Sequence, residues 1–274
     1  MTTLAPALAD LPLSAPVNLR DLGGIPVAGG TVHPGVVLRA DDLATIDQAS
    51  ADGLVARGLR AVVDLRSADE VALTGRGTLG VAPQVTYHHV PFMANIGQAA
   101  DDTGRPGGRT ATADMLDQSR FGAMYLRMFE GAASQIVTAL AVIAWSPGAV
   151  AFHCAAGQDR TGVLAAAVLL TLGAETEDVV TDYSRTGANS AAIQERIAPV
   201  MAPLLARFGF DLDAAARAAV RAEFSDAPMR ELIATLTERH GDPLAPLRAA
   251  GLTDGLVARL RERLLRPADD ADVA

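Results

Sequence analysis

The chain carries one cysteine, Cys154, and Arg160 follows it six residues later in the stretch HCAAGQDRTG. The apolar run 149–153 predicts a short buried strand before the cysteine, and a helix is predicted from Thr161 onward. A five-residue loop between a strand and a helix can turn successive backbone N–H groups inward, which makes an anion-binding nest. The positive end of the following helix strengthens such a site. The stretch therefore predicts a site for a phosphate group.

Arg160 and Cys154 have complementary properties for phosphate chemistry. The guanidinium of Arg160 is a planar fork of donors that suits two phosphate oxygens. Inward N–H groups, the helix end and Arg160 all favour a thiolate, so we expect the pKa of Cys154 to fall from about 8.5 to roughly 3.5–7.5. A thiolate is the nucleophile that covalent phosphoryl transfer requires. The predicted phosphate-binding residues are Ala155, Ala156, Gly157, Gln158, Asp159 and Arg160.

Two neighbours of the loop have predicted supporting roles. Thr161 is placed to hydrogen-bond the sulfur and to help it leave in a second step. His153 is expected to brace the loop rather than to transfer protons. A lone cysteine after an apolar strand is, by itself, more often a small buried residue. The joint pattern of Cys154, Gly157, Arg160 and Thr161 at a strand-to-helix turn favours the phosphate site over that alternative.

The segments that must hold this loop alternate between strands and helices. Strands are predicted at 36–39, 60–66, 85–90 and 149–153, and helices at 43–57, at about 113–145 and from 161 onward. Ser67, with Glu70 three residues later, predicts a capping box at the start of another helix. Residues 97–112 are predicted to form a loop, and nearly everything after about 175 is predicted to be helical. The alternation predicts an α/β fold with a central, mostly parallel sheet flanked by helices in three layers.

Composition narrows the classes of protein. Half of the 274 residues are apolar and the formal net charge is −9, which suits a soluble globular protein with a sizeable core and disfavours nucleic acid as a partner. All 23 basic residues are arginine, so Schiff-base and Walker-type lysines are excluded. One cysteine rules out an intramolecular disulfide and a multi-cysteine metal site, and it suits a reducing compartment.

The sequence also bears on location and cofactors. The first 16 residues have no positive n-region, and no apolar run reaches the roughly 18 residues that a membrane-spanning helix needs. We therefore predict a cytoplasmic protein without integral membrane association, while export without a signal peptide stays open. No pair of histidines has a ligand spacing on a convincing element, so no metal is predicted, and thiolate chemistry needs no cofactor.

The stretch HCAAGQDRTG resembles the signature of the cysteine-dependent protein tyrosine phosphatases. Other segments resemble one bacterial branch of that family: NLRDLGG at 18–24, VVLRADDL at 36–43, VVDLRSADEV at 62–71, DYSRTG at 182–187 and the helical pattern at 229–252. The likeness spans nearly the whole chain. It implies the three-layer phosphatase fold, a cysteinyl-phosphate intermediate and phosphotyrosine as a substrate.

The general acid has two candidates. The chain contains no Trp-Pro-Asp, since its one tryptophan, Trp145, lies in Trp-Ser-Pro. Asp159 occupies the position that the branch's acid would have, and the alternative is a carboxylate that pairs with arginine and fixes the loop. Asp64 ends a predicted strand, at the edge where α/β sites lie. It is a candidate to protonate the leaving group, to orient Arg160 or to cap a helix.

Other features of the likeness concern the rim of the site. Arg20 and Asp21 are expected either to line this rim or to form a structural ion pair. The branch usually carries lysine where this chain has Gln158, so activity on polyphosphorylated lipids is disfavoured here. The branch also uses a helical pair as a lid, which implies a lid at 188–228 that would shield the thiolate from water and peroxide. The alternative is that these helices simply cover the domain.

The sequence thus predicts a single phosphatase domain over 1–274 that hydrolyses phosphate monoesters. Phosphotyrosine in proteins is the leading substrate. A small-molecule phosphatase acting on a sugar, nucleotide or lipid phosphate is the enzymatic alternative, since the aromatic content of 4% leaves few rings to stack on a phenyl group. A catalytically silent phosphate-binding module is the alternative from another class. The sequence gives no prediction of the oligomeric state.

Overall fold

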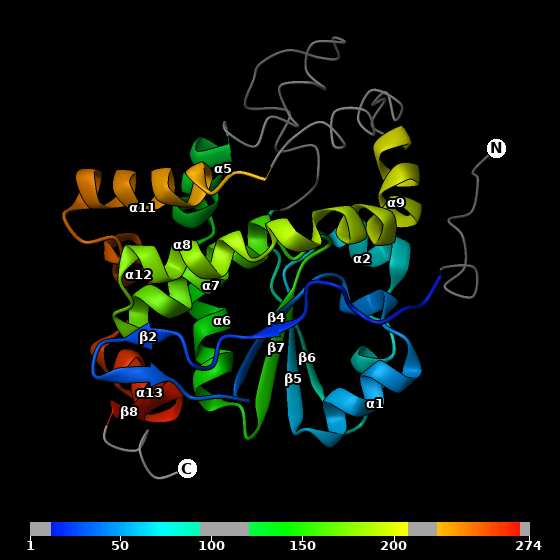
Figure 1. Cartoon of the computed structure of the whole chain (residues 1–274), viewed down its shortest axis with the longest axis horizontal. Helices are drawn as coiled ribbons and strands as arrows, with labels where there is room; N and C mark the ends of the chain where they lie inside the picture. The colour runs from blue at the N-terminus through cyan, green and yellow to red at the C-terminus, as the bar shows by residue number, and fades with distance from the viewer. Residues whose placement is uncertain (1–11, 94–120, 208–223, 269–274) are drawn as a thin grey trace.

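The computed structural model describes residues 12–93, 121–207 and 224–268, and the predicted loop at 97–112 lies outside these residues. Figure 1 shows a central sheet with helices on both sides. The sheet comprises β1 (Arg20–Asp21), β4 (Val37–Ala40), β7 (Ala149–His153), β5 (Leu59–Asp64) and β6 (Thr86–His89), in that spatial order. The strands from β4 to β6 are parallel, and only the edge strand β1 is antiparallel to its neighbour. The predicted mostly parallel α/β fold is confirmed.

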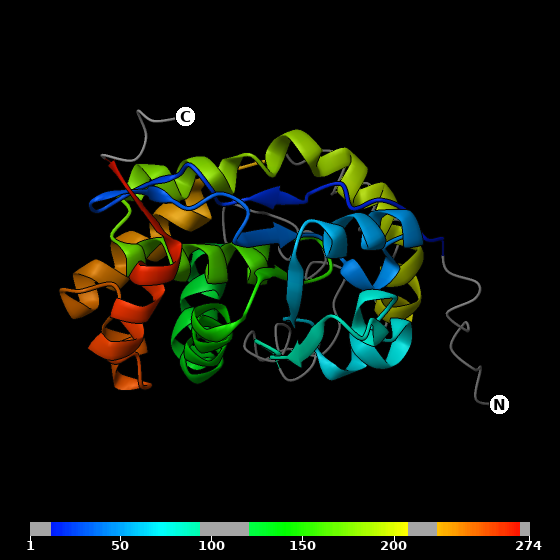
Figure 2. The same ribbon diagram turned by 90° about the horizontal axis from the view of Figure 1, so that it is seen from below.

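The two faces of the sheet bury different side chains because successive residues of a strand point to opposite sides. Val63 and Phe152 belong to the larger apolar cluster, together with α5 (Phe121–Gly131), α6 (Ala133–Trp145) and α7 (Asp159–Leu172). Val62 and Ala151, one residue away, belong to a second cluster with α1 (Gln48–Ala56). Figure 2 shows these helical layers on either side of the strands.

Three predicted helices have different bounds in the structure. The segment 43–57 divides into the 3-10 helix η2 (Leu43–Thr45) and α1, because Asp42 and Asp47 each accept a backbone N–H and start a new helix. The segment that ends at 145 breaks between α5 and α6, and α7 begins at Asp159 rather than Thr161. The capping box is confirmed: α2 (Ala68–Thr74) begins with reciprocal bonds between Ser67 and Glu70.

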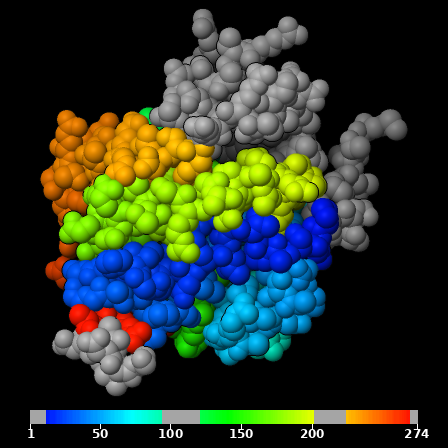
Figure 3. Space-filling view, in the orientation of Figure 1, coloured from blue at the N-terminus to red at the C-terminus, as the bar shows by residue number. Residues whose placement is uncertain are grey.

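The remaining elements cover the sheet and join the two ends of the described chain. They are β2 (Pro26–Val27), β3 (Gly30–Val32), η3 (Leu79–Val81), α8 (Thr176–Ser184), η5 (Gly187–Asn189), α9 (Ser190–Arg207), α11 (Ala227–His240), α12 (Ala245–Ala249), α13 (Asp254–Leu264) and β8 (Leu265–Pro267). The small antiparallel sheet β2-β3-β8 pairs the N-terminal hairpin with the C-terminal strand. In Figure 3 the N-terminal segment forms a band that runs beside α8 and α9 across one face.

The helices were also compared with the requirements of a membrane crossing. Among the described residues, no single helix is both long and apolar enough for one. The pair α5 and α6, bent by 72° at its break, meets the criteria of length and composition only when the two helices are taken together.

Candidate active site

Cys154 lies directly after β7, the central strand, where the carboxyl ends of the parallel strands meet. It is the first residue of the segment 154–160, called the signature loop below, which leads into α7. Its side chain is 1% exposed. Gly157 has a φ of +70°, and a Cβ there would lie 2.6 Å from the carbonyl oxygen of Ala40. This turn of the loop therefore requires glycine, because a side chain would meet both backbone strain and the end of β4.

Three consecutive carbonyl groups of the signature loop bind donors from other segments. The backbone N–H of Asp42 donates to the oxygen of Ala155 at 3.0 Å. The Asn18 amide donates to the oxygens of Ala156 and Gly157, at 3.3 and 3.2 Å. In a trans peptide the N–H points away from the C=O. The N–H groups of the three following residues, 156–158, are therefore directed away from these donors.

A buried arginine and aspartate support the loop from behind. Arg39, on β4, donates at 2.8 Å to the oxygen of Gly157 and at 2.5 Å to Asp182 on α8. Arg20 donates to the other oxygen of Asp182 at 2.9 Å. Burial would raise the pKa of Asp182, but the charges of Arg39 and Arg20 outweigh it and lower that pKa. Arg20 thus forms a structural ion pair with Asp182, and not with its neighbour Asp21.

Burial is also the main reason why the pKa of Arg20 falls to about 10, with repulsion from Arg39 adding to it. Asn18 extends this cluster, since its Oδ1 accepts from Arg20 at 2.6 Å. The segments NLRDLGG and DYSRTG, far apart in sequence, therefore meet through these bonds. Figures 1 and 3 show the bands that carry them side by side.

Arg160 binds Glu70 through both terminal nitrogens, at 2.5 and 2.8 Å. Burial alone would lower the pKa of Arg160, but the charge and hydrogen bonds of Glu70, with smaller electrostatic contributions from Cys154 and Asp159, raise it. A guanidinium has five N–H donors. The pair with Glu70 uses one on each terminal nitrogen, which leaves the edge that carries Nε–H for a phosphate. Arg160 and Cys154 thus lie close enough to interact electrostatically, as their spacing predicts.

Asp159 is the first residue of α7 and is partly exposed. Tyr125, on α5, donates to its Oδ1 at 2.6 Å. Burial raises the pKa of Asp159, and the opposing effects of the Tyr125 hydroxyl and the Arg160 charge do not cancel that rise. A carboxyl with a raised pKa within the signature loop has the property that a proton donor needs.

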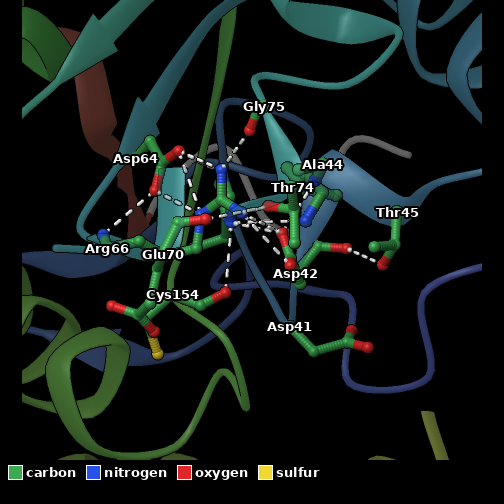
Figure 4. A network of polar contacts seen from close by, with 12 residues as sticks. Asp41, Asp42, Ala44, Thr45, Asp64, Arg66, Glu70, Thr74, Gly75 and Cys154 are labelled. Atoms are coloured by element: carbon green, nitrogen blue, oxygen red, sulfur yellow. Dashed lines mark hydrogen bonds and ion pairs between the residues drawn. The ribbon is translucent and has the colours of Figure 1, made fainter. Parts of the chain in front are cut away.

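Asp64 has a different environment. Its carboxylate, fully buried, accepts three bonds from the Arg66 guanidinium and one from the Tyr87 hydroxyl at 2.6 Å. Burial would raise its pKa, but His153 and Arg66 lower it well below the ordinary range. Figure 4 shows this network of Asp64, Arg66 and Asp42, with Glu70 and Cys154 at its edge. Asp64 neither orients Arg160, which Glu70 does, nor caps α2, which Ser67 does.

His153 and Thr161, the two predicted supporting residues of the signature loop, have contrasting surroundings. His153 is buried, and its Nδ1 lies 3.2 Å from the backbone N–H of Leu43, which donates to it. This bond fits a bracing role between β7 and η2. Thr161 is fully buried, and among the described residues its hydroxyl has no hydrogen-bond partner. A buried hydroxyl without a partner costs free energy unless something else binds it, so the Thr161 hydroxyl is available as a donor at the start of α7.

Several residues that build this site had no predicted role in it: Asn18, Arg39, Tyr125, Asp182 and Glu70, which was predicted only to complete a capping box. Four of them stand inside the segments that resemble the bacterial branch, and that was the available signal. Tyr125 had none, because it lies on a helix whose packing partners the sequence does not reveal. Among the described residues, no group of three His, Cys, Asp or Glu side chains is arranged to hold a metal ion.

Comparison with known proteins agrees with this geometry. A profile of the tyrosine phosphatase family matches residues 11–266. The triple specificity protein phosphatase PtpB of Mycobacterium tuberculosis is 30% identical over 278 residues, which cover 90% of this chain and 96% of PtpB. A candidate tyrosine-protein phosphatase of Cupriavidus necator is 31% identical over 237 residues, covering 81% of this chain and 78% of that protein. The chain therefore belongs to the tyrosine phosphatase family.

Proposed function

We propose that this phosphatase hydrolyses phosphate monoesters through a cysteinyl-phosphate intermediate. In the first step the thiolate of Cys154 attacks phosphorus, an S–P bond forms, and the P–O bond to the leaving group breaks. Asp159 donates its proton to the departing oxygen. In the second step Asp159 takes a proton from water, the water oxygen attacks phosphorus, and the S–P bond breaks. Inorganic phosphate and the thiolate are released, so atoms and protons balance.

The charge on the phosphoryl oxygens is stabilised by the loop and by Arg160. The N–H groups of residues 156–158 supply donors in this proposal, because the carbonyls of the same peptide groups, those of residues 155–157, are held on the other side. The start of α7 adds partial positive charge, and Gln158 provides no side-chain cap that would compete for it. Preorganised donors of this kind commonly supply the largest share of catalysis.

Thr161 serves the second step in this proposal. Its buried hydroxyl, free of other partners among the described residues, donates to the sulfur as negative charge returns to it. Thr161→Val has nearly the same volume and removes the donor. It should slow hydrolysis of the intermediate more than its formation, and burst kinetics with an aryl phosphate would detect this. Equal effects on both steps would contradict the assignment.

Two observations favour Asp159 over Asp64 as the acid. The pKa of Asp159 is raised, so the carboxyl holds its proton to higher pH, whereas the carboxylate of Asp64 is kept ionised by Arg66 and His153. Asp159→Asn should remove the alkaline limb of kcat/KM and reduce activity most on esters with poor leaving groups. Asp64→Asn should chiefly reduce stability. The reverse result would assign the proton to Asp64.

We propose phosphotyrosyl proteins as the substrate. Cys154 is almost fully buried, which favours a long aryl ester over the short phosphoserine side chain. The M. tuberculosis relative is named a triple specificity phosphatase, so the substrates tested should extend beyond phosphotyrosine. With Gln158 in the loop, no lysine charge is available for additional phosphates, so polyphosphoinositides should be poor substrates of this chain.

The decisive experiment is a panel of phosphopeptides, phosphoinositides and small phosphate esters, assayed with wild type and Cys154→Ser in parallel. Turnover of phosphotyrosyl peptides that is lost in Cys154→Ser, with substrate binding retained, is the expected result. Preferential hydrolysis of a sugar or nucleotide phosphate would show that the substrate is a small phosphate ester and not a phosphotyrosyl protein. Binding without turnover in the wild type would identify a phosphate-binding module instead.

We further propose that residues 1–274 form one phosphatase domain and that 188–228 shield the thiolate as a lid. The described part of that segment includes α9, which Arg196 fixes to Asp41 and to the chain near Ser14. Residues 208–223 lie outside the described residues. A mechanism that depends on a reduced thiol also suits the cytoplasm, and we propose that compartment.

A further inference from the structure

Two tyrosines adjoin the signature loop. Tyr125 on α5 is fully buried, and its hydroxyl lies 2.6 Å from Oδ1 of Asp159. The hydroxyl of Tyr183, on α8, lies 2.8 Å from that of Tyr125, and the two rings meet edge to face with their centroids 6.1 Å apart. Three groups from three helices thus form a continuous chain of short hydrogen bonds that ends on Asp159.

The direction of these bonds follows from the number of protons. Each hydroxyl has one proton, and the carboxylate oxygen can only accept, so Tyr125 donates to Asp159. Tyr183 must then donate to Tyr125. The bond to Oδ1 exists whether Asp159 is ionised or protonated, because a protonated carboxyl keeps one acceptor oxygen. Among the described side chains, Tyr125 donates to this carboxyl, and it does so at Oδ1. The exchangeable proton is therefore assigned to Oδ2.

We infer that Tyr125, supported by Tyr183, is a positioning residue that fixes the Asp159 carboxyl and directs its Oδ2 proton toward the leaving group. This inference rests on the proposed function of Asp159 as the general acid. A phenylalanine at position 125 would fill the same buried space, so packing alone does not explain the hydroxyl of Tyr125. A hydroxyl in a buried position needs a partner, and the partner here is the acid.

The packing of Tyr183 shows that its place is specific. Gly162 is the fourth residue of α7, and a Cβ there would lie 3.1 Å from Cδ2 of Tyr183. The Tyr183 ring also packs against Phe224, with centroids 5.1 Å apart. The absence of a side chain at Gly162 therefore allows the ring to approach α7 closely enough for its hydroxyl to reach Tyr125.

The same hydrogen bond sets the acid's working range. The titratable groups that act on Asp159 are Tyr125 on α5 and Arg160 on its own helix, and Tyr183 on α8 reaches it through Tyr125. Cys154, in the signature loop, acts on the neighbouring Arg160. Burial raises the pKa of Asp159, while the Tyr125 hydroxyl and Arg160 lower it. Tyr125 therefore keeps the acid able to lose its proton in the first step and to act as a base in the second.

Tyr125→Phe tests the inference in the full-length protein. Its alkaline limb of kcat/KM should move to higher pH by about one to two units, the size expected for losing one hydrogen bond to a charged group. The activity on phenyl phosphate should fall by about 10²-fold, because the proton is no longer aimed. Activity on p-nitrophenyl phosphate should fall much less, because that leaving group barely needs an acid.

Tyr87→Phe is the matched control. It removes another tyrosine hydroxyl that donates to a carboxylate at 2.6 Å, but the carboxylate is that of Asp64. This variant should change stability and leave the pH of the alkaline limb in place. Tyr183→Phe should shift the limb in the same direction as Tyr125→Phe but by less, since the donor to Asp159 remains.

A double-mutant comparison completes the test. In an Asp159→Asn background, adding Tyr125→Phe should cost no further activity if Tyr125 acts through the acid. An unmoved limb, equal losses on both esters, or additive losses in the double variant would each overturn the inference. If Tyr125→Phe does not fold, the shift in Tyr183→Phe decides. Different results would contradict the proposed function itself, namely an inactive wild type or an active Cys154→Ser variant.

Discussion

Glu70 binds the Arg160 guanidinium with both carboxylate oxygens, and the same carboxylate closes the capping box of α2 by accepting the backbone N–H of Ser67 at 2.7 Å. One side chain therefore joins the start of a helix on one face of the sheet to the loop that follows the central strand. Because the same carboxylate makes both contacts, a movement at the start of α2 would also change the orientation of Arg160.

Glu70→Gln separates these two contacts. The amide oxygen of glutamine can still accept from Ser67, but the charge that fixes Arg160 is lost. We expect kcat/KM to fall by about 10²-fold, because Arg160 no longer has a single orientation. Ser67→Ala is the control: it removes the hydroxyl cap, should cost about 1 kcal/mol of unfolding free energy, and retains the pair with Arg160. Similar losses of kcat/KM in both variants would contradict this division.

The pair also predicts a dependence of stability on pH. Burial would raise the pKa of Glu70, but Arg160 lowers it below the unfolded value. A depressed carboxyl pKa stabilises the folded state above the unfolded pKa of about 4.3, and this stabilisation is lost as the pH falls through the folded pKa. Urea denaturation across this acidic range should show a smaller loss of stability in Glu70→Gln than in wild type. Parallel curves would contradict the ion pair.

Gly157 offers a test of the loop's shape. Gly157→Ala places a Cβ against the end of β4 at a left-handed φ, so the loop must shift. Loss of inhibition by orthovanadate, by about 10²-fold or more, is expected. Gly24→Ala is the matched control, since Gly24 has a φ of +82° and nothing within 4 Å of its added Cβ. It should lose about 1–2 kcal/mol from backbone strain while vanadate binds normally.

The elements nearest the chemistry were the most predictable from sequence. The strand at 149–153 has the predicted bounds, and the Ser67–Glu70 capping box is present, because local patterns specify a buried strand and a helix start. The partner of Arg39 was not predictable. Asp182 is 143 residues away, and only the tertiary structure brings α8 within hydrogen-bond reach of β4. No spacing rule reports such a contact.

The same limit explains the assignment of Asp64. Its place at the end of a strand made it a candidate acid, but a strand end does not reveal that Arg66, two residues on, folds back onto it. The choice between two carboxylates depends on their surroundings, and those come from tertiary structure. For Asp159 they come from Tyr125 on α5, which no local pattern connects to the signature loop.

Asp182→Asn tests the support behind the loop. Asparagine has the same shape but leaves Arg39 and Arg20 buried without a countercharge, which should cost about 3–5 kcal/mol of unfolding free energy. Because Arg39 also holds the carbonyl of Gly157, affinity for inorganic phosphate should fall as well. Asp178→Asn, on the same helix, is the control and should change neither quantity appreciably. Wild-type stability in Asp182→Asn would show that the pair contributes little.

Arg196 tests the proposed shielding of the thiolate. This side chain ties α9 to Asp41 at 2.7 Å and to the backbone oxygen of Asp42 at 2.9 Å, while α9 lies next to α2 (Figure 1). Arg196→Ala removes charge-assisted bonds, each contributing about 1.5–3 kcal/mol, so α9 should separate more often from the site. Inactivation by hydrogen peroxide should become several-fold faster and should be slowed by added phosphate. Gln194→Ala, an exposed change on the same helix, should react as wild type does. Equal inactivation rates in all three proteins would show that α9 covers the fold without protecting Cys154.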